Sequence, residues 1–214
     1  MLAASFNLII GYGGLISVAH PVFYAIGAYG SAILARDHGW PVYASLLAGM
    51  LLAVVASVLV ALPSLRVSGD YLLIASIGFQ LGILEILKNA AWSGGAGGLT
   101  NIPAALSPGT GREVYAALVA VVAIFAVMLV RAIAHGPYGR ALSAMRDDAL
   151  AFAALGRNAG ALKVVTFAVG SGLAGFAGGL YAHYFQFLVA GPIRAAGLIR
   201  VLIFWALVQG SGWR

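Results

Sequence analysis

The sequence predicts an all-α fold: a polytopic membrane helix bundle of about six to seven apolar segments. Hydrophobic residues make up 62% of the 214 residues and charged residues only 8%, whereas a soluble domain carries about 25% charged residues. Unbroken apolar runs at 42–62 and 114–133 approach the roughly 20 residues that cross a bilayer as a helix. A transmembrane β-barrel would instead show alternating strands of about 10 residues. We therefore predict a single membrane domain over residues 1–214.

Hydropathy and helix breakers divide the chain into segments. The first two are short, and residues 11–21 between them read GYGGLISVAHP, whose glycines and proline interrupt a helix. We expect a broken or re-entrant helix there, which a membrane tolerates where protein or a water-filled cavity satisfies the backbone. The expected segments are 2–16, 21–35, 41–62, 71–91, 114–134, 161–187 and 196–210.

The basic residues predict the orientation. Residues 131–163 carry five of them, against one or two in each other loop, so this region faces the cytoplasm. Counting outward, 92–113 is external, 63–70 internal and 36–40 external. The net charge of +6 is dispersed among loops, which is typical of topology determinants and not of a nucleic-acid binder. The absence of cysteine excludes disulfides and thiolate metal sites within the sequence.

The polar island at 134–163 lies between two spanning segments. Alanine and leucine dominate between Gly139 and Leu155, and neither proline nor glycine interrupts them, so we expect a helix of about four turns that Gly156 ends. Its apolar stripe suits docking into a groove on a soluble partner, although such a helix can also lie flat on lipid headgroups. The stripe comprises Leu142, Met145, Phe152 and Leu155, and the charged positions are Arg140, Arg146, Asp147 and Asp148.

Glycines in the last long segment formally match a dinucleotide-binding pattern in GSGLAG, residues 170–175. That pattern requires a preceding strand and an acidic residue about 20 positions later, and no acidic residue follows Asp148. Ser171, Gly175 and Gly179 instead share one helix face, which predicts close helix packing in lipid.

Other chemical sites are not indicated. The four histidines show no metal-ligand spacing, no catalytic constellation is evident, and the chain lacks a phosphate-binding GxxxxGK[ST] motif for ATP. We therefore predict no catalytic residue, no metal and no cofactor bound by this chain.

Two polar residues fall inside an apolar run. Glu85 is an intramembrane carboxylate, which by default raises a functional hypothesis, but Lys88 follows three residues later on the same face and can pair with it. Both interpretations stay open. Gln80 can hydrogen-bond a neighbouring helix or a passing solute.

Four stretches of the chain resemble permeases of the branched-chain amino acid ABC importer family. The first is SFNLIIGYGGLISVAHPVFYAIGAY and the second is LPSLRVSGDYLLIASIGF. The loop GGLTNIP and the run from Gly139 to Tyr184 follow in the right order. The resemblance covers roughly residues 4–190. The stretch from 196 to 214 diverges, and Arg200 interrupts its apolar run. Because family members are longer, we expect the chain to be truncated, with helices absent at both ends.

The resemblance implies a multi-pass permease subunit of the bacterial inner membrane, not an enzyme. Its partners would be a second permease subunit, two ATP-binding cassette subunits that hold the ATP, and a periplasmic solute-binding protein, in contact with membrane lipid and without nucleic acid. The helix around Ala141–Leu155, with Gly156, would be the coupling helix to the ATPase. The glutamate that names the family's coupling loop is missing, with Leu150-Ala151-Phe152 in its place.

Alternating access would carry branched-chain or related amino acids inward. Helix termini near residues 11–21 could present N–H groups to the carboxylate. Three alternatives stay open: the same architecture carrying urea or short amides, a secondary transporter without ATPase partners, and a membrane-embedded enzyme. The candidate pathway residues are Gly13, Ser17, His20, Tyr29, Gln80 and Glu85.

Overall fold

A computed structural model describes residues 1–15, 17–66, 70–105 and 112–189 of the chain. Within these ranges the regular structure is helical, apart from one isolated bridge between Leu99 and Leu188. The prediction of an all-helical membrane bundle is therefore confirmed. Four helices in the described part are long and apolar enough to cross a membrane, and they cover Val42–Leu62, Tyr71–Asn89, Glu113–His135 and Ala159–Phe185.

The predicted count of six to seven segments is not confirmed. Segment 196–210 lies outside the described residues, and segment 2–16 contains only a short apolar helical stretch, Leu2–Tyr12. The segment predicted at 21–35 becomes α2 (His20–Asp37), which has 18 residues. The other long helices are α3 (Val42–Arg66), α4 (Asp70–Asn89), α5 (Arg112–His135) and α8 (Ala159–Phe185).

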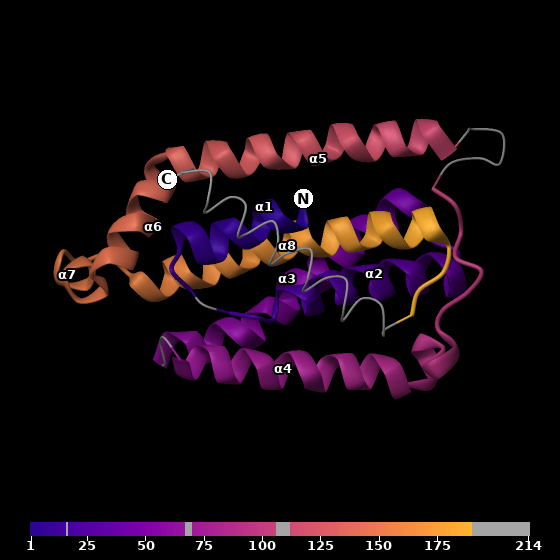
Figure 1. Ribbon diagram of the computed structural model, residues 1–214, viewed down its shortest axis with the longest axis horizontal. Coiled ribbons are helices and arrows are strands. Elements are labelled where there is room, and N and C mark those ends of the chain that lie inside the picture. The colour runs from indigo at the N-terminus through magenta and orange to yellow at the C-terminus, as the bar shows by residue number, and fades with distance from the viewer. Residues whose placement is uncertain (16, 67–69, 106–111, 190–214) are drawn as a thin grey trace.

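Consecutive long helices run back and forth between the two ends of the bundle (Figure 1). The turn after α2 and the loop after α4 lie at one end. At the opposite end, α6 (Pro137–Asp147) and α7 (Ala149–Ala154) extend beyond the other helices. This alternation agrees with the orientation that the basic residues predict, and we call the end with α6 and α7 the cytoplasmic end.

Glycine-mediated contacts join α2, α3 and α8 at the centre of the bundle. A Cβ added at Gly27 would clash with the backbone of Gly175, and one at Gly49 would lie 2.6 Å from the Gly27 carbonyl oxygen. One added at Gly179 would lie 2.7 Å from Leu46 Cδ2. Helices in lipid associate through such close backbone approach, because no hydrophobic drive holds them together. These three helices therefore form the closely packed centre of the described structure.

The helices α5 and α4 flank this centre on opposite sides (Figure 1). Both expose large apolar side chains along their length, including Val121, Phe125 and Met128 on α5 and Ile74 and Ile77 on α4. In a membrane such faces meet lipid or another membrane subunit, so their exposure does not conflict with stable folding.

The break predicted at residues 11–21 is confirmed. The first helix, α1 (Leu2–Asn7), continues into the π-helix η1 (Leu8–Tyr12), and Gly14 then adopts the left-handed conformation with φ of 62°. Regular helix resumes only at His20, with Pro21 in the first turn of α2, where its missing N–H is not needed. The N-terminal region therefore enters the bundle as a broken helix.

Candidate functional site

The cytoplasmic loop contains two helices where the sequence predicts one over 139–155. Asp148 is extended, with φ of −150° and ψ of 102°, and it separates α6 from α7. Its Oδ1 accepts hydrogen bonds from the N–H groups of Leu150 and Ala151, both at 2.9 Å. Aspartate is a strong helix N-cap because its carboxylate satisfies N–H groups that lack a partner in the first turn. The prediction of one continuous helix is wrong for this reason.

The end of the loop follows the sequence expectation. The helix α7 ends at Ala154, and Gly156 adopts a φ of 75° just beyond it, which is the left-handed helix stop that glycine favours. Asn158 then caps α8, because its Oδ1 accepts from the N–H of Ala161 at 2.9 Å. Two side-chain caps and one glycine thus fix the path of the loop.

Most of the predicted docking stripe packs inside the chain. Leu142, Met145 and Phe152 are buried in one cluster with Leu8 and Val130. The reason is that α6 folds back against α5 and η1, so its apolar face serves the protein's own core. These three side chains are not available to a partner in this conformation.

The exposed large apolar residues of the loop are Leu150, with 85% of its surface accessible, and Leu155, with 81%. Leu155 belongs to the predicted stripe, and sequence reasoning missed Leu150. Both lie on or directly after α7, at the end of the bundle that projects beyond the spanning helices (Figure 1). These two leucines are thus large apolar side chains exposed outside the apolar spans.

The charged residues of the loop have different surroundings. Arg140 is exposed, and Asp147 lies 3.9 Å from Arg146 in a loose ion pair. Arg146 Nη1 also donates a hydrogen bond of 2.5 Å to the carbonyl oxygen of Gly11, 135 residues earlier in the chain. With Asp148 acting as the cap, three of the four predicted charged residues make contacts within the chain.

The candidate pathway residues fall into three separate groups. Gly13, Ser17 and His20 lie around the break before α2, where Nε2 of His20 is 2.8 Å from Ser5 Oγ. Because the Ser5 hydroxyl donates to the carbonyl of Leu2, the histidine is the donor in this pair. Its Nδ1 is buried without a partner among the described residues.

Tyr29 on α2 and Gln80 on α4 form the second group. Both are buried, and the Tyr29 hydroxyl and Gln80 Oε1 have no hydrogen-bond partner in the described part of the chain. One turn before Gln80, Ser76 Oγ accepts from the N–H of Val18 at 3.0 Å. The two helices therefore each hold a buried polar atom at membrane depth, which is costly unless it finds a partner.

Glu85 stands apart from both groups. Its side chain is exposed, with Oε1 3.7 Å from Lys88 Nζ and 2.8 Å from Asn89 Nδ2. The pairing with Lys88 that the sequence allows is thus present near the external end of α4.

His183 is a buried polar residue that sequence reasoning did not select. Its Nδ1 donates to the carbonyl of Pro103 at 2.8 Å, and its Nε2 lies 3.2 Å from Ser31 Oγ and 3.3 Å from Ser45 Oγ. Because the Ser45 hydroxyl donates to the carbonyl of Val42, the hydroxyl of Ser31 is the group that donates a hydrogen bond to Nε2 of His183. His183 therefore ties α2, α3 and α8 to the external loop, and its position at a helix end gave no signal of this.

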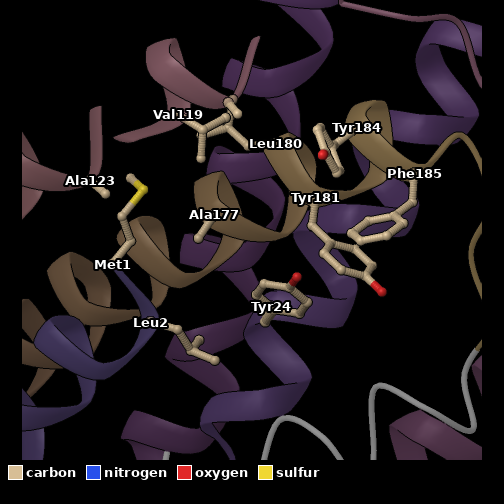
Figure 2. A pocket seen from close by; sticks show the side chains of 11 residues that line it. Met1, Leu2, Tyr24, Val119, Ala123, Ala177, Leu180, Tyr181, Tyr184 and Phe185 are labelled. Atoms are coloured by element: carbon tan, nitrogen blue, oxygen red, sulfur yellow. The ribbon is translucent and has the colours of Figure 1, made fainter. Parts of the chain in front are cut away.

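A pocket of about 470 Å³ opens between α1, α2, α5 and α8 (Figure 2). Figure 2 shows Tyr24, Tyr181 and Phe185 along one part of its wall, with ring centroids 5.8 Å apart for the two tyrosines. None of the six candidate pathway residues lines this pocket. Its mixture of aliphatic carbon and tyrosine hydroxyl groups is typical of small-molecule pockets.

Comparisons with known proteins agree with the resemblance noted in the sequence. High-affinity branched-chain amino acid transport system permease protein LivM of Escherichia coli (strain K12) is 30% identical over 209 residues, covering 85% of this chain and 49% of that protein. A probable branched-chain amino acid transport permease protein LivM of Methanocaldococcus jannaschii is 31% identical over 174 residues, covering 80% of this chain and 50% of that protein. No solved structure gives a significant match.

The chain spans about half the length of the curated relatives it matches. The family described as branched-chain amino acid transport system / permease component matches residues 1–211, so the match extends beyond residue 190, where the resemblance noted in the sequence ends. The chain therefore belongs to this family of membrane permeases.

Proposed function

We propose that this chain is the transmembrane permease subunit of an ATP-driven importer in the bacterial inner membrane. It would carry branched-chain or related small amino acids by alternating access, with a second permease subunit, two ATPase subunits and an external solute-binding protein as partners. Family membership supports the class of transporter. The structural observation that carries the coupling to an ATPase is the pair of exposed leucines on the cytoplasmic loop.

Within the part of the chain that the structure describes, no side chain covers Leu150 or Leu155, since both remain more than four-fifths exposed. A groove on a soluble ATPase subunit would bury both leucines and leave Asp147 and Asp148 in water. In this arrangement α6 and α7 together would serve as the coupling element, with α7 as the contact.

The three buried residues of the predicted stripe do not contact the ATPase in this proposal. Leu142, Met145 and Phe152 anchor α6 and α7 to the membrane helices, since their cluster includes Leu8 of η1 and Val130 of α5. A force on α7 would therefore reach the spans through packed side chains, which resist deformation because protein interiors are densely packed.

Co-purification of the ATPase subunits tests the coupling surface. We expect the double variant Leu150→Asp/Leu155→Asp to lose the ATPase subunits, because two carboxylates would have to be desolvated in the contact. The matched variant Leu150→Met/Leu155→Met keeps an apolar surface and should retain them. If the aspartate variant folds and still holds the ATPase subunits, α7 is not the contact.

A further inference from the structure

One arginine joins the cytoplasmic loop to the broken N-terminal helix. Arg146 lies in the last turn of α6, and its Nη1 donates to the carbonyl oxygen of Gly11 at 2.5 Å. The hydrogen bond connects residues 135 positions apart in the chain. It is therefore a tertiary link between the element that faces the cytoplasm and the region where the first helix is interrupted.

The π-helix makes the acceptor available. The N–H groups of Gly13, Gly14 and Leu15 bond to the carbonyls of Leu8, Ile10 and Ile9, so the described donors that follow Gly11 are already used. The Gly11 carbonyl lies at the C-terminal end of η1, where the helix dipole favours a positive charge. A guanidinium group suits this position, because hydrogen bonds from charged donors are stronger than those from neutral ones.

The aliphatic stem of the same arginine packs over Gly14. A Cβ added at Gly14 would clash with Arg146 Cγ and would lie 3.4 Å from Arg146 Cβ. Gly14 is left-handed, with φ of 62°, so glycine is favoured here both by conformation and by the close approach of the arginine. The contact between the loop and the helix break thus involves the backbone itself.

Packed side chains reinforce the link on the adjacent face. Leu142 and Met145 of α6 share a buried cluster with Leu8 of η1. The next long helix after the π-helix is α2, whose first residue, His20, is tied back to α1 through Ser5. Movement of α6 would therefore displace the break and the start of α2 together.

We propose that Arg146 is a positioning residue that transmits movement of the cytoplasmic loop to the helix break at Gly11–Gly14. This inference rests on the proposed function, in which α6 and α7 are the coupling element. It names Gly11–Gly14 as the segment that the coupling element moves. Arg146 then acts inside the chain, between α6 and η1, and the contact with the ATPase belongs to α7.

A disulfide in place of the arginine contact tests this role directly. The 214 residues contain no cysteine, so Gly14→Cys/Arg146→Cys introduces the chain's only pair of thiols. Their Cβ separation of 3.4 Å lies next to the range of about 3.5–4.5 Å found in disulfides. Thiol labelling of the purified transporter should report that the pair closes on oxidation, while each single variant stays fully labelled. Failure of the pair to close would overturn the proposed contact.

Transport by the same variant reports the function of the link. With the pair reduced, the arginine contact is missing and we expect amino acid uptake to fall about tenfold, a common size for coupling between sites, while ATPase activity persists. Oxidation replaces the contact with a covalent bond and should restore uptake. Uptake that stays low after oxidation, or that is normal before it, would contradict the proposal.

Single substitutions provide a second measurement that does not depend on the left-handed glycine. Arg146→Met keeps an aliphatic stem but has no donor and should uncouple ATP hydrolysis from uptake. Arg146→Lys should retain most uptake because an ammonium group can also donate to the Gly11 carbonyl. Arg157→Met removes another exposed arginine of the same loop and should leave uptake unchanged. Equal losses in the lysine and methionine variants of Arg146 would contradict a hydrogen-bonded link. If the unmodified transporter shows no ATP-dependent uptake, that result would instead contradict the proposed function.

Discussion

Nδ1 of His183, near the end of α8, donates a 2.8 Å hydrogen bond to the carbonyl oxygen of Pro103 in the external loop. The same loop pairs with the segment after α8 through two hydrogen bonds between Leu99 and Leu188, at 2.8 and 2.9 Å. One buried histidine and one short backbone bridge therefore fasten the external loop to α8 and the segment that follows it.

We expect His183→Ala to loosen the external loop. The substitution leaves the Pro103 carbonyl and the Ser31 hydroxyl without their partner, and a buried polar group that loses its partner costs about 1–3 kcal/mol. Amide hydrogen exchange at Leu99 should accelerate by roughly tenfold or more. His38→Ala, at an exposed position after α2, is the control, and equal exchange in the two variants would contradict the role of His183.

The cap at Asp148 predicts a local change in the cytoplasmic loop. Asp148→Ala removes the acceptor of two N–H groups and should destabilise α7 by about 1 kcal/mol. Faster amide exchange at Leu150 and Ala151, without a change elsewhere in the chain, is the expected result. Asp147→Ala neutralises the adjacent, exposed carboxylate and should leave exchange in α7 unchanged.

The helix contact at Gly175 predicts opposite effects for two glycine substitutions. Gly175→Ala places a methyl group against Ala53 on α3, and overpacking of this kind costs about 1–3 kcal/mol. Gly78→Ala, on α4, meets no atom within 4 Å and should stabilise the helix by up to about 1 kcal/mol. Thermal unfolding in detergent should therefore occur at a lower temperature for Gly175→Ala and not for Gly78→Ala. A higher unfolding temperature for Gly175→Ala would contradict the close contact.

Sequence patterns predicted the features that depend on local physics. Long apolar runs identified the four spans, and the glycines and proline at 11–21 identified the broken helix, because both signals act within one or two helical turns. The helix stop at Gly156 was predicted from a local signal of the same kind. The reading of GSGLAG as a packing motif also relied on spacing along one helix.

The features that the sequence did not predict depend on distant contacts or on competing local ones. Asp148 divides the cytoplasmic helix because its side chain binds the backbone, although the flanking alanine and leucine residues favour a continuous helix. An apolar stripe does not reveal what covers it, so Leu142 could equally have faced a partner or Leu8. His183 contacts residues 80 to 152 positions away, and no local pattern records such pairs.

Uptake into proteoliposomes tests the central claim most directly. The complete transporter, with its second permease, its ATPase subunits and its solute-binding protein, is reconstituted and supplied with radiolabelled leucine or urea. We expect uptake of leucine that requires hydrolysable ATP and that is lost in Leu150→Asp/Leu155→Asp. Uptake of leucine without ATP, or ATP-dependent uptake of urea in preference to leucine, would contradict the account.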